Sequence, residues 1–222
     1  MPLDVSTKDC SQLSEEELAE MTELCADVAG RFDLDTIAGQ KKAWVLVTQV
    51  REGDHLRGFS FSTLERIGGT PAIIIGMAHV RRNAKRDQVV KALMSDNYRR
   101  ALMAFPDEDV LVGTRLASVD GYDAFKALTD INPRPAHKSS GEDRAWGRRL
   151  AKRFGCEAGY DDKSFVVTGG DCYPPVFDHE SLKPEKQEPG FTEFFEGLKA
   201  DNGDCLIAFG WILAEDLLKY NA

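Results

Sequence analysis

The stretch from Pro71 to Phe105 constrains the fold more than any other part of the chain. It opens with PAIIIGMAHV, a run that is apolar on both faces of an extended strand and so indicates a central strand of a sheet. A basic turn follows, and the next apolar spacing predicts a helix from about Asp87 to Phe105. The residues expected to line its core side are Val90, Leu93, Met94, Ala101 and Leu102. Because another apolar run follows at 110–117, we expect a parallel strand–helix–strand crossover.

The N-terminal part predicts a strand at 3–8, a helix and then a meander of strands. Ser14 followed by Glu17 forms a capping box, which marks a helix start. The apolar stripe of this helix is Leu18, Met21, Leu24, Cys25, Val28 and Phe32. Strands are expected at 43–50, 56–67 and 71–80, joined by turns at 52–54 and at Gly68-Gly69. Adjacent hairpin strands of this kind are antiparallel.

The C-terminal part alternates helices, loops and strands. A short helix capped by Asp120 is expected to reach Leu128, and a longer helix is expected at 142–154. Between them, 132–141 reads as a loop. Strands are expected at 164–168 and 205–212, with a polar loop at 171–190, a short amphipathic helix around Phe191 to Leu198 and a short terminal helix. The whole pattern predicts an α/β (α+β) fold with a mixed, mostly antiparallel central sheet flanked by helices. We expect a single domain over 1–222, with insertions at about 131–160 and 171–200.

Composition excludes several classes of protein. The chain has 222 residues and a formal net charge of −9, which argues against general nucleic-acid binding. Its five cysteines are scattered and contain no C-x-x-C pair, so neither a disulfide framework nor a zinc knuckle is expected. The start has no signal-peptide pattern, and no apolar run reaches the roughly 18–20 residues of a membrane span. We therefore expect a cytoplasmic protein with no membrane or nucleic-acid partner.

The element order and the run from Val80 to Met94 together resemble the GNAT superfamily of N-acyltransferases. In that family a strand leads into an R-G-x-G-x-G/A turn and a helix carrying A-L-L. Here Lys85 stands where the family has Arg, and Arg86, Gln88 and Val90 stand where it has glycine or a small residue. The resemblance implies that turn N–H groups and a helix N-terminus hold the pyrophosphate of coenzyme A, while the preceding strand holds the pantetheine arm. The residues implied in cofactor binding are Ala78, His79, Val80, Lys85, Arg86, Asp87, Gln88, Val89 and Val90.

The basic residues of the turn and of the 142–154 helix each have more than one interpretation. Four of the six residues from Arg81 to Arg86 are basic, which suits either phosphate binding or a solvated turn. The basic face from Arg148 to Arg153 suits a solvated helix side, an acidic partner or the 3′-phosphate of the coenzyme. Asp178-His179-Glu180, with Cys172 upstream, matches no established ligand spacing, so no metal site is predicted.

Three residues are candidates for catalysis. The near-neutral pKa of a histidine suits His79 as a general base that deprotonates an amine, and Glu65 is a second candidate. Tyr122 is a candidate acid for a leaving thiolate. The alternatives are a histidine of the core at position 79 and a packing aromatic at position 122.

These observations favour an acyl-CoA-dependent N-acyltransferase, with acetyl-CoA or another acyl-CoA as co-substrate. The acceptor would be a small-molecule or peptide amine, and a homodimer is one assembly that we consider. A second hypothesis is a non-catalytic GNAT-like binding or regulatory protein that has lost coenzyme binding. A third is an unrelated α/β protein that uses the turn for a nucleotide or phosphorylated ligand. Serine hydrolase, P-loop and simple dinucleotide-binding motifs are absent from the sequence.

Overall fold

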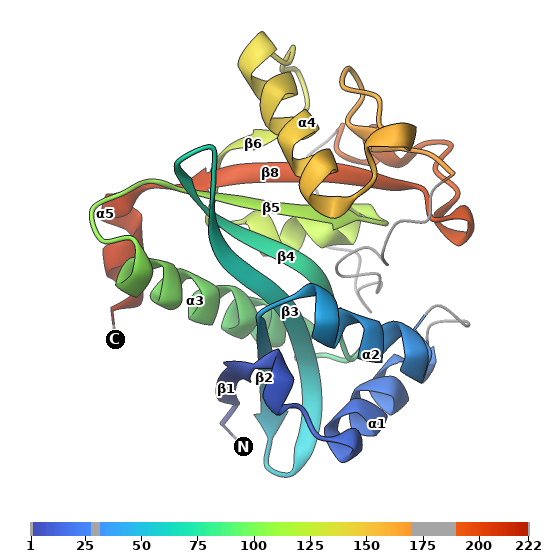
Figure 1. Cartoon of the computed structure of the whole chain (residues 1–222), viewed down its shortest axis with the longest axis vertical. Helices are drawn as coiled ribbons and strands as arrows, with labels where there is room; N and C mark the ends of the chain where they lie inside the picture. Colours follow the sequence, from blue (N-terminus) through green and yellow to red (C-terminus); the bar gives the residue numbers. More distant parts are fainter. Residues whose placement is uncertain (1, 28–31, 170–189, 222) are drawn as a thin grey trace.

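A computed structural model describes residues 2–27, 32–169 and 190–221. Within these ranges, a single sheet of eight strands forms the centre of the molecule (Figure 1). The strands are β1 (Asp4–Asp9), β2 (Leu46–Glu52), β3 (His55–Ile67), β4 (Thr70–Val80), β5 (Val110–Leu116), β6 (Thr129–Asn132), β7 (Val166–Val167) and β8 (Cys205–Ile212). Their order across the sheet is β1-β2-β3-β4-β5-β8-β6, and β7 also pairs with β8.

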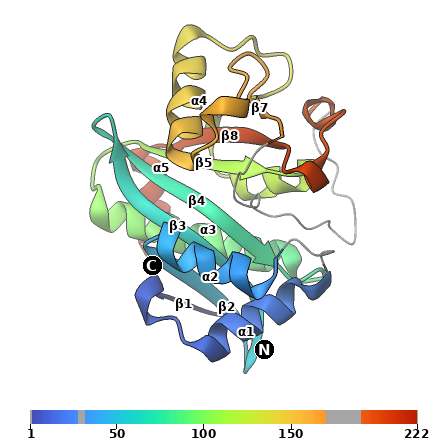
Figure 2. The same ribbon diagram turned by 45° about the vertical axis from the view of Figure 1, so that its right-hand side comes forward.

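Helices cover both faces of this sheet. The α-helices are α1 (Glu15–Leu24), α2 (Leu34–Ala43), α3 (Arg86–Ala104), α4 (Gly141–Phe154) and α5 (Ala214–Leu217). Short 3₁₀ helices are η1 (Cys10–Gln12), η2 (Cys25–Asp27), η3 (Val119–Phe125), η4 (Glu157–Gly159), η5 (Thr192–Phe195), η6 (Ala200–Asn202) and η7 (Leu218–Tyr220). Helix α3 lies behind β3 and β4, whereas α1 and α2 lie in front of them (Figures 1 and 2).

The strand pairing confirms the predicted fold class. Among the described strands, β4 and β5 are the one parallel pair, and all other neighbours are antiparallel. The crossover between β4 and β5 is α3, as the sequence predicted. Every residue of β4 after Thr70 is buried, which explains why this strand carries no polar alternation.

The N-terminal helix begins as predicted but ends early. Ser14 Oγ accepts a hydrogen bond from Glu17 N at 3.2 Å, and Glu17 Oε2 accepts one from Ser14 N at 2.9 Å, which completes the capping box. The prediction of one helix reaching Phe32 is wrong, because α1 ends at Leu24 and a second helix, α2, follows. Helix α2 buries only Ile37 and Gln40, so its sequence has no apolar stripe to reveal it. The predicted core residue Val28 lies outside the described residues.

Several C-terminal elements also differ from the prediction. The helix expected from Asp120 to Leu128 is the 3₁₀ helix η3, whose N-cap is Ser118. Strand β6 was not predicted; it pairs with β8 only through Thr129 and Asn132, so its extended form depends on tertiary contacts. The expected strand at 164–168 and amphipathic helix near Phe191 are reduced to β7 and η5. The predicted loop at 171–190 lies outside the described residues except for its last position. None of the described helices is long and apolar enough to cross a membrane.

Candidate functional site

The most distinctive feature of the sheet is the divergence of β4 from β5. The two strands pair in parallel at three positions, from Ala72–Leu111 to Ile74–Gly113, and no pairing between them continues beyond. Figure 2 shows the strands separating from this point onwards. Side chains of β5 bridge the start of the gap, because Thr114 Oγ1 donates to Ile75 O at 3.0 Å and Arg115 Nη2 donates to Gly76 O at 3.2 Å.

The last part of β4 presents its backbone to this gap. Arg81 N donates to Arg57 O at 2.9 Å, so residues 81 and 79 direct their backbone groups toward β3. Because backbone direction alternates along a strand, Ala78 and Val80 direct theirs to the opposite edge. No described strand pairs with that edge beyond Ile74. Two residues predicted to bind the pantetheine arm therefore offer backbone donors and acceptors in an extended geometry.

His79 lies between these two residues and is buried. Its ring lies 5.7 Å from the ring of Phe32 and 6.4 Å from that of Phe59, centroid to centroid. Arg57 is two residues from Phe59 on β3, and Arg81 is two residues from His79 at the end of β4. Because side chains alternate between faces, both lie on the same face of the sheet as His79. There they line a pocket of about 260 Å³ together with α1; its residues are Glu20, Glu23, Leu24, His55, Leu56, Arg57 and Arg81. His79 itself does not line this pocket, whose charged side chains are two carboxylates and two guanidinium groups.

The basic turn after β4 is tied to carboxylates of this chain. Lys85 Nζ donates to Glu52 Oε1, and Arg57 lies 3.0 Å from the other oxygen of the same carboxylate. The hydrogen bond from Lys85 is the main cause of a lowered pKa of Glu52. Arg86 is buried, and its Nη1 donates to Asp123 Oδ2 at 2.6 Å. Lys85 and Arg86, two of the four cations predicted to bind phosphate, therefore form ion pairs within the chain.

The remaining residues of the predicted coenzyme turn divide between surface and core. Asp87 and Gln88 are exposed, whereas Val89 and Val90 are buried on the sheet side of α3. Val89 packs against Gly58 of β3, where an added Cβ would lie 2.7 Å from Val89 Cγ1. The structure thus brings the strand residues 78–80 and the helix start together, but it turns much of the helix start inward.

Tyr122 lies in η3 and is buried in an aromatic cluster. Its hydroxyl donates to Pro133 O at 3.0 Å, and its ring lies 4.4 Å from that of Phe191. Burial raises the pKa of this tyrosine well above its usual range. No described contact joins Tyr122 to His79. The second candidate base, Glu65, accepts a hydrogen bond from Arg153 Nε at 2.6 Å and lies at the opposite end of β3 from Phe59.

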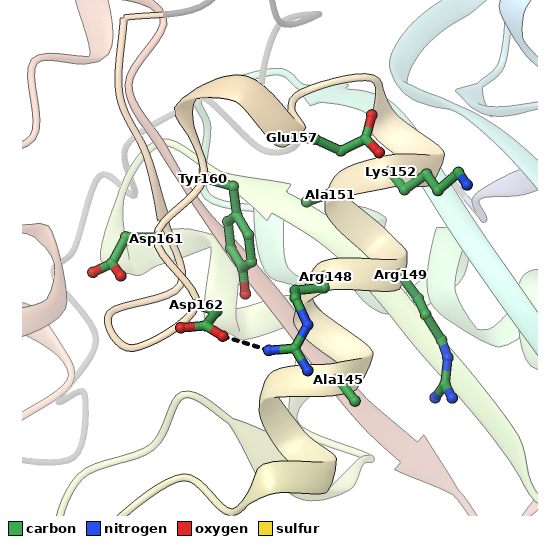
Figure 3. A pocket seen from close by; sticks show the side chains of 9 residues that line it. All are labelled: Ala145, Arg148, Arg149, Ala151, Lys152, Glu157, Tyr160, Asp161 and Asp162. Carbon is green, nitrogen blue, oxygen red and sulfur yellow. Dashed lines mark hydrogen bonds and ion pairs between the residues drawn. The ribbon is translucent and has the colours of Figure 1, made fainter.

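The basic face of α4 lines a pocket of about 600 Å³ (Figure 3). Its wall also carries carboxylates, and Arg148 is paired with Asp162. The guanidinium of Arg149 lies 4.5 Å from the centre of the Trp146 ring. In Figure 3 Arg149 points away from Tyr160 and Asp162. The pocket is therefore of mixed charge, and none of its lining residues belongs to β4 or β5.

The described residues contain no group of three or more His, Cys, Asp or Glu side chains that could hold a metal ion. Asp178-His179-Glu180 and Cys172 lie outside the described ranges. Sequence reasoning missed Glu52 and Asp123, the two carboxylates that hold Lys85 and Arg86. No motif marks them: Glu52 reads as part of a turn, and Asp123 lies 37 positions from its arginine.

Comparison with solved structures finds similar folds at low identity. A candidate acetyltransferase of the GNAT family from Desulfovibrio desulfuricans is 9% identical, with 95% of this chain and 99% of that chain covered and a TM-score of 0.42. The ribosomal-protein-S18-alanine N-acetyltransferase from Escherichia coli is 10% identical over 62% of this chain and 86% of that one, with a TM-score of 0.42.

The aminoglycoside 6′-N-acetyltransferase from Enterococcus faecium is 12% identical, with a TM-score of 0.40. The alignment covers 50% of this chain and 61% of that enzyme, which is less than two thirds of the enzyme's length. No protein-family model matches the sequence, and a search of curated proteins finds no similar sequence.

Proposed function

We propose that this protein is an N-acyltransferase that takes an acyl group from acyl-CoA, with acetyl-CoA as the first donor to test, and passes it directly to an amine. The observation that carries the proposal is the edge of β4 at Ala78 and Val80, two buried residues with which no described strand pairs. The pantetheine arm of acyl-CoA contains two amides in an extended chain, and it can pair with such an edge as an added strand does. The acyl group would then lie in the gap beside His79.

The proposed reaction is a single displacement at the thioester carbonyl. The amine nitrogen attacks this carbon, the C–N bond forms, and the C–S bond breaks to release the thiol. Backbone N–H groups at the strand edge would stabilise the negative charge that develops on the carbonyl oxygen. His79 would accept the proton of the attacking amine. Tyr122 would protonate the thiolate, for which its hydroxyl must turn away from Pro133 O.

The pocket lined by α1 is the proposed entrance for the acceptor. Glu20 and Glu23 place carboxylates there, and Arg57 and Arg81 place guanidinium groups there, so the pocket carries charges of both signs. Glu20 also pairs with Arg51 across β2, which fixes the position of its carboxylate. The proposed acceptor class is a small-molecule or peptide amine, and the mixed charge of the pocket does not select a cationic acceptor over a neutral one.

Ligand binding is tested first by thermal unfolding with acetyl-CoA, CoA, ATP and phosphate. A ligand at a hundredfold excess over its Kd stabilises the folded state by about 2.7 kcal/mol, which for a chain of this size raises Tm by roughly 5–11 °C. We expect this shift with acetyl-CoA and CoA and not with phosphate. An unchanged Tm at saturating acetyl-CoA would contradict the proposal. Release of free thiol in the presence of a panel of amines then tests turnover.

The strand edge can be tested with a pair of substitutions at one position. Ala78→Pro removes the N–H that faces the gap and leaves the β3–β4 hydrogen bonds of residues 79 and 81 in place. Ala78→Ser keeps the N–H and nearly the same size. We expect the acetyl-CoA shift to disappear only in the proline variant. A shift of equal size in both folded variants would place the donor elsewhere.

The internal pairing of Lys85 and Arg86 favours one alternative, a binding or regulatory protein without catalysis. Because this alternative has lost coenzyme binding, its expected signature is an unchanged Tm with CoA or acetyl-CoA and no thiol release with any amine. Thiol release that depends on an added amine would rule it out.

A further inference from the structure

The start of α3 is the natural place for the diphosphate of a nucleotide donor, because it follows directly on the edge of β4 at Ala78 and Val80, with which no described strand pairs. A helix N-terminus binds phosphate through N–H groups that have no partner within the helix. Here Lys85 N donates to Asn83 Oδ1 at 2.8 Å, and Arg86 N donates to Asn83 O at 3.1 Å. The first two donors of this terminus are therefore already used by the turn.

Two of the four cations of the basic turn, Lys85 and Arg86, are also occupied. The Glu52 carboxylate accepts hydrogen bonds from Lys85 and, at 3.1 Å, from Arg57 Nε, and only 12% of its side chain is exposed. Arg86 is held at Asp123 and also donates to Asp120 O at 3.1 Å. A phosphate at this position would have to displace a carboxylate that already fills the same role.

The first turn of α3 adds repulsion and bulk. Asp87 is half-exposed there and would lie close to any phosphate that approached the remaining N–H groups. The buried side chain of Val89 holds the turn against Gly58, so the backbone cannot move outward without losing that contact. By contrast, the edge at Ala78 and Val80 is not paired with any described strand.

We infer that this protein recognises its thioester donor through the pantetheine arm and acyl group, and that the diphosphate and nucleotide add little. This inference rests on the proposed function. The donor class is then pantetheine thioesters in general, whether in coenzyme A or on the phosphopantetheine arm of a carrier protein. Glu52 acts as the internal anion that replaces the donor phosphate.

The test compares kcat/KM for acetyl-CoA and for S-acetylpantetheine, which lacks every phosphate, by release of free thiol with one amine acceptor. We expect the two values to agree within about threefold, whereas even one charge-assisted hydrogen bond to the diphosphate would favour acetyl-CoA by about tenfold or more. Such a preference for acetyl-CoA would overturn this inference and leave the proposed function intact. Absence of transfer from all donors would instead refute the proposed function.

A third donor, a carrier protein bearing an acetylated phosphopantetheine arm, distinguishes the two sources. If kcat/KM for this donor exceeds that for S-acetylpantetheine, the carrier protein is the source of the thioester donor, because the carrier is what has been added to the pantetheine arm. A value below it identifies the free thioester.

Glu52→Gln tests the internal anion directly. The variant releases Lys85 and Arg57 for a phosphate, so we expect KM for acetyl-CoA to fall while KM for S-acetylpantetheine stays the same. Glu108→Gln is the matched control. Glu108 also pairs with an arginine, Arg66, but this arginine lies near the end of β3, far in sequence from Arg57. A Glu52→Gln variant with unchanged or raised KM for acetyl-CoA would contradict the role of this carboxylate.

Discussion

The ion pair between Arg86 and Asp123 fixes the start of α3, and removing one partner should show its strength. Each side chain is 3% exposed, and the two charges lie 2.6 Å apart. In Asp123→Ala the arginine keeps its bond to Asp120 O and a contact with the half-exposed Asp87. Lys126, another partner of Asp123, is largely exposed and can turn to water.

The expected cost follows from the burial of the charge that remains. Breaking a buried ion pair from one side typically costs about 3–5 kcal/mol, because the other charge is left without compensation. Since Asp120 O and Asp87 still contact Arg86, we place Asp123→Ala at the lower end, near about 3 kcal/mol. For a chain of this size that corresponds to a fall in Tm of about 6–12 °C.

Thermal unfolding of matched variants measures this cost. Asp87→Asn removes the exposed partner of the same arginine and should cost at most about 1 kcal/mol. Arg86→Met combined with Asp123→Leu removes both charges and should recover most of the stability lost in Asp123→Ala. If Asp123→Ala lowers Tm no more than Asp87→Asn does, Arg86 is not held as described and remains available for a ligand.

Three further predictions concern stability and are measured by thermal unfolding. Gly76→Ala places a Cβ 1.7 Å from the Trp44 ring and should cost about 1–3 kcal/mol or more, whereas Gly39→Ala, in a helix with no neighbour within 4 Å, should gain up to about 1 kcal/mol. Ser140→Ala removes the N-cap of α4 and should cost about 1 kcal/mol; an unchanged Tm would contradict this. Burial alone would raise the pKa of Glu17, but hydrogen bonds from three neighbours outweigh it and lower the pKa to about 2. Because that value lies below the unfolded one, the stabilisation by Glu17 is complete above about pH 4.5 and is lost as the pH falls toward 2, so the deficit of Glu17→Gln at pH 7 should shrink below pH 4.

Periodicity was sufficient to predict the elements that carry their own apolar pattern. Strands β3 and β4 and helix α3 lie within one or two residues of their predicted bounds, because each buries a long and regular set of side chains. Helix α2 and strand β6 could not be predicted, since α2 buries two residues and β6 pairs at two positions. Their structure depends on contacts with distant elements.

The candidate site shows the same division. The sequence indicated that residues 78–80 end a central strand at the start of a helix, and the structure places them there. It also indicated a cluster of basic residues, but the partners of those residues are long-range. Glu52 lies 33 positions from Lys85, and no local pattern joins them. Charge along the chain therefore predicted where cations gather, but not which of them point inward.

The most direct test of the account is amide hydrogen exchange at the edge of β4, with and without saturating acetyl-CoA. We predict slower exchange at the Ala78 and Val80 amides when the donor is bound, because their N–H groups then donate hydrogen bonds to the pantetheine arm. The amide of Arg81, which already bonds to Arg57 O, should change less. Unchanged exchange at Ala78 and Val80 at saturating acetyl-CoA would contradict the claim that this edge binds the donor.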